Sequence, residues 1–126
     1  MAVDVLIAED EPSILESLGF ILRRAGWSIE TVTDGDAALT AVRRNRPKVL
    51  VLDVMLPKRS GFEVLKQIRA DALLKELPVL ILTAKGQAQD RRVAEELGAD
   101  SFVTKPYANA DVIGAVRRLM DGAPPG

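Results

Sequence analysis

Short apolar runs alternate along this chain with longer stretches in which apolar residues recur every three or four positions. The short runs predict strands at about residues 3–8, 28–32, 49–53, 79–83 and 101–104. The longer stretches predict helices at about residues 13–25, 36–45, 61–73, 87–97 and 109–121. This alternation predicts an α/β fold in which right-handed crossovers join parallel strands and helices cover both faces of the sheet.

The polarity of each run predicts its place in the sheet. The runs at 49–52 and 79–82 are wholly apolar, as strands buried on both faces are. The runs at 28–32 and 101–104 mix polar and apolar residues, which is typical of edge strands, and the first run is intermediate because it contains Asp4. This gradation fits a flavodoxin-like (βα)5 fold, a parallel five-stranded sheet with strand order 2-1-3-4-5, whose switch point lies between strands 1 and 3.

Proline, glycine and aspartate mark the expected ends of helices. Pro12 has the right position to open the first helix. Gly26 and Gly98 follow the first and fourth helices and are expected to stop them. Asp34 and Asp100 are each expected to cap a helix or a turn.

Length and composition point to one soluble domain. The 126 residues are 48% hydrophobic and 28% charged, which is typical of a globular chain of this size. We expect a domain over residues 1–121 and a flexible tail, or the start of a linker, at 122–126. The net charge of -1 leaves no basic footprint for direct nucleic-acid binding, and no apolar run approaches the ~20 residues that span a bilayer. We therefore expect no membrane partner and a cytoplasmic location.

The chain contains no cysteine and no histidine. Disulfides, thiolate metal sites and imidazole chemistry are therefore excluded. Chemistry must rely on carboxylates, hydroxyls and lysine, and a bound metal must be a hard cation that prefers oxygen ligands.

Polar residues capable of such chemistry stand where the apolar runs end. Glu9 and Asp10 follow the first run, Asp53 ends the third, Thr83 ends the fourth and Lys105 follows the fifth. Ligands in open α/β folds bind at the carboxyl edge of the sheet, where these groups are expected to meet. Each has a structural explanation by itself, as a helix cap, a dipole partner or a loop lysine. Their occurrence at successive strand ends favours a functional site.

Three converging carboxylates would repel one another unless a cation lay between them. Mg²⁺ suits a site with few protein ligands and several waters. Such a site can hold a phosphoryl group, with Lys105 and the Thr83 hydroxyl on its remaining oxygens. Asp53 would then be the attacking carboxylate and would form an aspartyl phosphate.

Four segments together resemble the receiver domain of two-component response regulators, similar in fold to the chemotaxis regulator. They are Leu6–Pro12, Leu52–Pro57, Leu82–Ala84 and Thr104–Pro106. The resemblance extends over almost the whole chain. It implies that Asp53 accepts a phosphoryl group from a phosphohistidine on a sensor histidine kinase or a histidine phosphotransfer protein.

The resemblance also implies a metal site and a switch. Mg²⁺ (or Mn²⁺) would be bound by Asp10, Asp53 and the backbone carbonyl of Met55, with Glu9, which stands where the family often has Asp, acting through water. Thr83 and Lys105 would contact the phosphoryl oxygens, and the Lys105–Pro106 peptide bond would be cis.

Signal output would involve Thr83 and Phe102. The resemblance implies that Thr83 moves toward the phosphoryl group, Phe102 turns inward, and the surface of the fourth helix, fifth strand and fifth helix changes. Phe102 is otherwise explained as a core residue of an edge strand. Met55 and Lys85 each lie two residues beyond a site residue, and we hypothesise that they set the lifetime of the phosphorylated state.

Two kinds of receiver protein fit. The first, which we favour, is a stand-alone or phosphorelay regulator acting on a downstream effector protein. The second is the N-terminal receiver of a longer DNA-binding transcription factor, whose own output domain would be the target. Five charged residues resemble the dimer face of winged-helix transcription factors: Asp90, Arg91, Glu96, Asp100 and Asp111.

In that set Arg91 could pair with Asp111, and a phosphorylation-dependent homodimer stays open. The set is incomplete because Leu97, Ser101 and Ala115 stand where charged partners are expected. An enzyme of the haloacid-dehalogenase type is rejected, because it needs a second Asp where Met55 stands. We expect at most slow autodephosphorylation.

Overall fold

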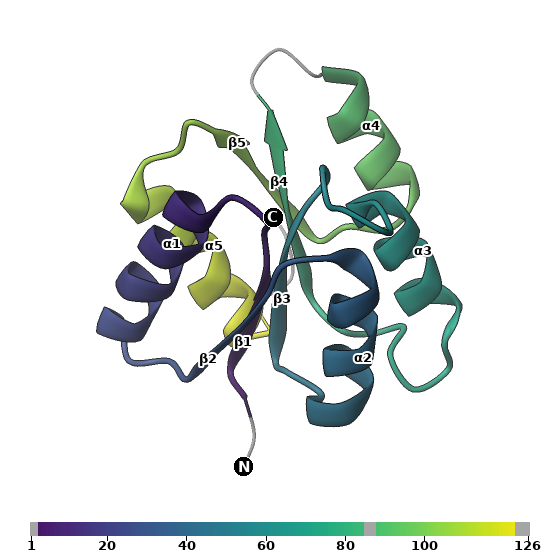
Figure 1. Ribbon diagram of the computed structural model, residues 1–126, viewed down its shortest axis with the longest axis horizontal. Coiled ribbons are helices and arrows are strands. Elements are labelled where there is room, and N and C mark those ends of the chain that lie inside the picture. Colours follow the sequence, from purple (N-terminus) through teal and green to yellow (C-terminus); the bar gives the residue numbers. More distant parts are fainter. Residues whose placement is uncertain (1–2, 85–87, 123–126) are drawn as a thin grey trace.

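The structure is a computed structural model that describes residues 3–84 and 88–122. Within these ranges, strands and helices alternate in a single parallel sheet of order β2-β1-β3-β4-β5 (Figure 1). The strands are β1 (Val5–Ala8), β2 (Ile29–Val32), β3 (Val49–Asp53), β4 (Val79–Ala84) and β5 (Ser101–Lys105). The helices are α1 (Pro12–Arg24), α2 (Gly35–Asn45), α3 (Gly61–Ala70), α4 (Ala88–Glu96) and α5 (Asn109–Met120). The predicted flavodoxin-like fold is confirmed.

Helices cover both faces of the sheet (Figure 1). Side chains along a strand point alternately to the two faces of the sheet, so each strand contributes residues to two cores. Val5 and Ile7 of β1 pack with α1 and α5, whereas Leu6 and Ala8 pack with α2 and α3. The sheet therefore separates two apolar cores.

Burial follows the predicted order of the strands. All residues of β1 and β3 are buried, and β4 is buried up to its last residue, Ala84. The edge strands β2 and β5 are mostly only partly buried. Asp53 therefore stands at the end of a central strand, paired with Leu82 of β4.

The sequence signals for helix ends are largely confirmed. Pro12 is the first residue of α1, and Gly26 and Gly98 adopt positive φ angles of 105° and 92°, which favour glycine. The Asp34 carboxylate caps α2 by accepting a hydrogen bond from the N–H of Ala37 at 2.7 Å.

Two expectations about local structure are wrong. Helix α3 ends at Ala70 rather than near residue 73, because Asp71 is extended and its carboxylate accepts the N–H of Leu73 at 2.9 Å, which begins a turn. Asp100 was expected to cap a helix or a turn, but the partners of its side chain in the described part of the chain are distant in sequence. Its Oδ2 instead accepts the Val79 N–H at 2.8 Å, at the start of β4.

Arg69 joins three segments at the amino-terminal edge of the sheet. Its guanidinium donates to the carbonyl oxygens of Lys75 at 3.0 Å, Leu77 at 2.7 Å and Gly98 at 2.9 Å, and to Asp100 Oδ2 at 2.8 Å. One side chain thus ties the end of α3 to the loops that precede β4 and β5.

None of the helices in the described part of the chain has the length and apolar character needed to span a bilayer.

Replacing Arg69 by Ala should lower the free energy of unfolding by about 2–3 kcal/mol, because four acceptors, one of them partly buried, lose a charged donor. Urea denaturation would measure the change. Lys66→Ala, an exposed position on the same helix, is the matched control and should change stability by less than about 0.5 kcal/mol. Equal stability of the two variants would show that Arg69 does not hold these segments together.

Candidate functional site

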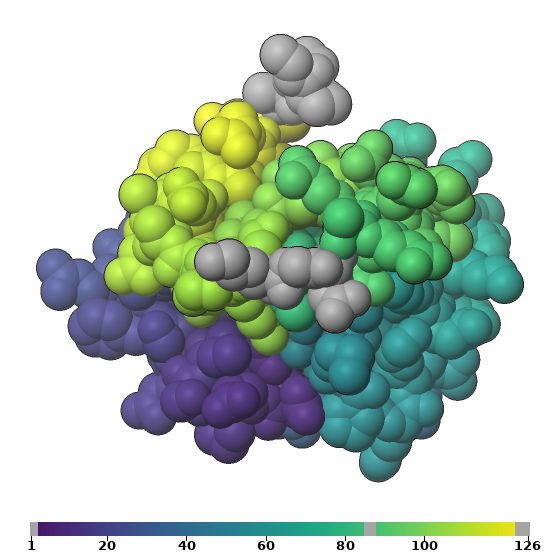
Figure 2. All heavy atoms as spheres, turned by 90° about the horizontal axis from the view of Figure 1, so that it is seen from above, coloured from purple at the N-terminus to yellow at the C-terminus, as the bar shows by residue number. Residues whose placement is uncertain are grey.

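The predicted site residues meet at the carboxyl edge of the sheet. Glu9 and Asp10 directly follow β1, Asp53 ends β3, Thr83 lies near the end of β4, and Lys105 ends β5. Figure 2 looks onto this edge and shows the purple N-terminal segment, the teal segment after β3 and the yellow-green segment after β5 side by side. The fold therefore brings together groups that lie up to 96 positions apart in the chain.

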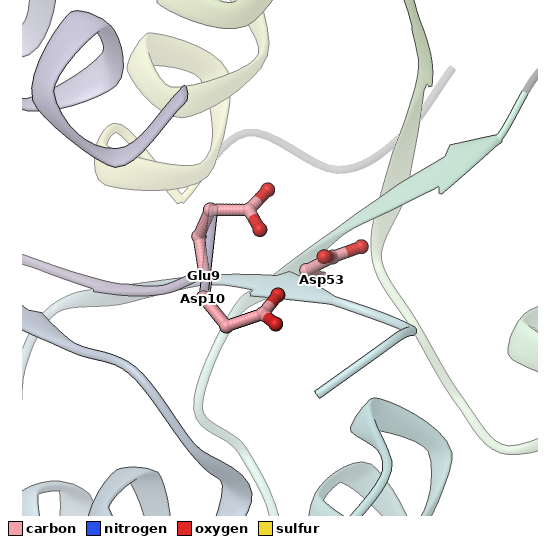
Figure 3. Close-up of side chains that lie close together, drawn as sticks. All are labelled: Glu9, Asp10 and Asp53. Atoms are coloured by element: carbon pink, nitrogen blue, oxygen red, sulfur yellow. The ribbon is translucent and has the colours of Figure 1, made fainter. Parts of the chain in front are cut away.

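Glu9, Asp10 and Asp53 form a compact acidic cluster. One carboxylate oxygen from each lies within 4.8 Å of the others, and the side chains of Glu9 and Asp10 extend from the end of β1 toward Asp53 (Figure 3). Glu9 is 0% exposed and Asp53 is 5% exposed, whereas Asp10 faces solvent. The cluster is thus buried on one side and open to water on the other.

Lys105 supplies the positive charge at this cluster. Its Nζ donates to Glu9 Oε1 at 2.8 Å and lies 3.3 Å from Asp53 Oδ2. The peptide bond between Lys105 and Pro106 is cis, as the resemblance implies. The Thr83 side chain is almost fully buried beside these groups, at 2% exposure.

Glu9 and Asp53 interact unequally with Lys105. Burial raises the pKa of Glu9, but hydrogen bonds from Lys105 and from the Glu11 N–H outweigh it and the pKa is lowered. For Asp53, burial and then the neighbouring Glu9 raise the pKa to about 6. Burial also opposes the charge of Lys105, yet its two carboxylate neighbours raise its pKa. Glu9 is the charged partner of the lysine, and Asp53 carries the unfavourable charge.

The composition of the cluster fits a hard divalent cation. Three carboxylates and one ammonium group leave an uncompensated negative charge. The atoms that the three carboxylates offer to a metal ion are all oxygens. The solvent-facing Asp10 leaves room for the waters that Mg²⁺ retains when it binds to proteins.

The loop after β3 closes tightly against Asp53. The Gly61 N–H donates to the Val54 carbonyl at 2.9 Å, and a Cβ on Gly61 would lie 2.2 Å from the carbonyl oxygen of Asp53. Only glycine allows this approach. Sequence analysis missed Gly61, although a glycine directly after a helix-capping serine was a usable signal.

Phe102, one of the two expected output residues, lies on β5, the last strand of the sheet. Phe102 is partly buried against the core that faces α2, α3 and α4, and the Arg91 guanidinium lies 5.2 Å from its ring centroid. No ion pair joins Arg91 to Asp111 in the described part of the chain, so the suggested pairing does not form within this chain. Lys85, one of the two hypothesised lifetime residues, lies outside the described residues, and the other, Met55, has a 75% exposed side chain.

The family model of the response regulator receiver domain matches residues 5–117. The chain belongs to this family. Receiver domains are signalling domains rather than enzymes in the usual sense, and they bind Mg²⁺ in an acidic pocket like the cluster of Glu9, Asp10 and Asp53.

Individual relatives agree with this membership. The Probable transcriptional regulatory protein TcrX of Mycobacterium tuberculosis is 45% identical over 118 residues, which cover 94% of this chain and 50% of TcrX. This receiver domain spans about half the length of the curated relatives it matches.

Solved structures agree as well. A protein described as a response regulator of Chloroflexus aurantiacus has a TM-score of 0.91 at 30% identity, over 96% of this chain and 99% of that one. The receiver domain of sensor histidine kinase PA1611 of Pseudomonas aeruginosa has a TM-score of 0.87 at 26% identity, over 96% and 99% of the two chains. That structure has a magnesium ion coordinated in its active-site cleft.

The raised pKa of Asp53 predicts a pH-dependent cost to the metal-free receiver domain. The carboxyl has an ordinary value of 3.8 and a value of about 6 in the folded state, so the folded protein binds more protons between these limits. Its contribution to stability therefore falls as pH rises from about 4 to about 6.

Asp53→Asn removes this titration. In EDTA, the variant should exceed the wild type in free energy of unfolding by an amount that grows over this pH range and is constant above it. Urea denaturation at a series of pH values would measure the difference. A difference that does not change between pH 4 and pH 7 would contradict the assignment.

Proposed function

We propose that this receiver domain accepts a phosphoryl group on Asp53 from the phosphohistidine of a sensor histidine kinase or a histidine phosphotransfer protein. The supporting observation is the position of Asp53, a nearly buried carboxylate between two acidic neighbours and one lysine. A carboxylate oxygen attacks phosphorus, and an O–P bond forms as the N–P bond of the donor breaks. The electron pair leaves with the donor imidazole, which takes up a proton.

Glu9, Asp10, Asp53 and the backbone carbonyl of Met55 would hold Mg²⁺ (or Mn²⁺). A bound divalent cation would neutralise charge on the phosphoryl oxygens and align them with the nucleophile. Glu9 keeps its negative charge because Lys105 donates to it, and Asp10 lies on the open side of the cluster. The two side chains therefore favour a cation between β1 and β3.

Lys105 and Thr83 would bind the oxygens of the transferred group. Lys105 Nζ already lies 3.3 Å from an Asp53 oxygen, within reach of a group attached there. Thr83 comes from the neighbouring strand, one residue beyond the partner of Asp53 in the sheet register. A hydroxyl and an ammonium on two sides suit an anion with three equatorial oxygens.

The signal would leave through α4, β5 and α5. We propose that Thr83 moves toward the phosphoryl group and that Phe102 then turns inward. Arg91 stacks on Phe102 and so links the ring to α4. A switch of this kind biases an equilibrium between two states that exist before phosphorylation.

Incubation with Mg²⁺ and acetyl phosphate, followed by intact-mass measurement, should give one phosphoryl adduct on the wild type. Asp53→Ala should give none, because the nucleophile is gone, and EDTA should abolish the adduct on the wild type. Asp111→Ala, an exposed acidic residue on α5, is the matched control and should be phosphorylated normally. An adduct on Asp53→Ala of equal yield would exclude Asp53 as the acceptor.

A second proposal concerns the natural protein. We propose that this domain is the receiver part of a transcriptional regulator rather than a stand-alone phosphorelay protein. The supporting observation is that the matched relatives are about twice as long and that TcrX is named a transcriptional regulatory protein. The sequence alone favoured the stand-alone form because the charged face lacked partners at Leu97, Ser101 and Ala115.

The complete reading frame of the gene tests this proposal. It should continue beyond Gly126 into a second domain able to bind DNA. A stop codon directly after Gly126 would favour the stand-alone form, in which a separate effector protein reads the α4-β5-α5 surface.

A further inference from the structure

The first turn of α2 contacts the loop between β3 and α3, which comprises residues 54–60. The Gly35 N–H donates to the Pro57 carbonyl oxygen at 3.1 Å, and the Arg59 N–H donates to the same oxygen at 2.7 Å. One carbonyl in the middle of the loop is thus held both by the loop itself and by the start of a helix.

Two ion pairs flank this backbone contact. Arg59 Nε lies 2.8 Å from Asp36 Oδ1, and Lys58 Nζ lies 3.8 Å from Asp34 Oδ2. Lys58 also has a positive φ of 68°, a conformation that a lysine rarely adopts without support from its surroundings. The start of α2 therefore holds the loop at Pro57 and at the two residues that follow it.

The contact is too close for any side chain at Gly35. A Cβ there would lie 2.0 Å from the Arg59 carbonyl oxygen and 2.7 Å from its carbonyl carbon. Both are backbone atoms, so an alanine at this position forces the loop and the helix apart. The start of the same loop is fixed by Gly61, which packs on the backbone of Asp53 and Val54.

Met55 lies between these two fixed points. Its side chain is 75% exposed, so side-chain packing does little to orient its backbone carbonyl. The direction of that carbonyl must come from the path of the loop. Mg²⁺ demands near-ideal octahedral geometry, so its affinity is sensitive to a displaced carbonyl ligand.

We propose that Gly35, with the Asp36–Arg59 pair beside it, positions the metal-binding loop of this receiver domain. The inference rests on the proposed role of the Met55 carbonyl as a metal ligand. Gly35 is not among the proposed ligands of the metal or of the phosphoryl group. It acts through Pro57 and Arg59, and its effect is on the affinity of the site for Mg²⁺.

Calorimetric titration of the metal-free protein with Mg²⁺ tests this role without any measurement of phosphorylation. Gly35→Ala should weaken Mg²⁺ binding about tenfold, as is common when a residue that orients a metal ligand is changed. Gly114→Ala is the matched control, because a Cβ on Gly114 meets only the end of the Arg118 side chain, at 3.8 Å. It should bind Mg²⁺ like the wild type.

Arg59→Gln provides a second test that leaves the backbone contact intact. Removing a positive charge near the site would by itself tighten Mg²⁺ binding, whereas loosening the loop weakens it. We expect binding about two- to threefold weaker than in the wild type, in keeping with the loss of one exposed ion pair. The two effects change the Mg²⁺ affinity in opposite directions, so the measurement distinguishes positioning of the loop from simple electrostatics.

The outcomes are distinct. A folded Gly35→Ala variant with the Mg²⁺ affinity of the wild type overturns the inference. If Gly35→Ala does not fold, Arg59→Gln decides, and unchanged or tighter binding overturns the inference. Wild-type protein that binds no Mg²⁺ at all refutes the proposed metal site itself, and the inference with it.

Discussion

The structure brings mutually repelling carboxylates together at the carboxyl edge of the sheet. Five parallel strands in this order place the ends of β1 and β3 side by side, and both ends carry carboxylates. Lys105 offsets only part of that charge and sits closer to Glu9 than to Asp53. The surroundings of Asp53 therefore disfavour its charged form. Perturbed carboxyl groups of this kind cluster at functional sites, which agrees with the role proposed for Asp53.

The fold and the acidic cluster were predictable because both leave local marks in the sequence. A wholly apolar run that ends in an acid, as at Asp53, identifies a central strand and the edge where it ends. Strand polarity also gave the order of the sheet. The overextended third helix shows the limit of such patterns. Leu73 continues the helical spacing, but it is 72% exposed and belongs to a turn begun by Asp71.

The residues that hold the site in place were not predictable in the same way. Gly35 and Gly61 matter because of the backbone opposite them, and Arg69 matters because three segments converge on it. For Gly35 and Arg69, nothing in the neighbouring sequence indicates which residues they contact. Their roles arise from contacts between parts of the chain that come together only in the folded protein.

Arg69 also has a consequence for how α4 can move. Its hydrogen bonds to Gly98 and Asp100 fasten the segment directly after that helix to the rest of the domain. The other end of α4 lies toward the carboxyl edge, where Thr83 ends the buried part of β4. A displacement of α4 that begins at Thr83 would therefore rotate the helix about its C-terminal end, which Arg69 holds in place. The largest excursion would then occur near the carboxyl edge of the sheet and the smallest near Asp100.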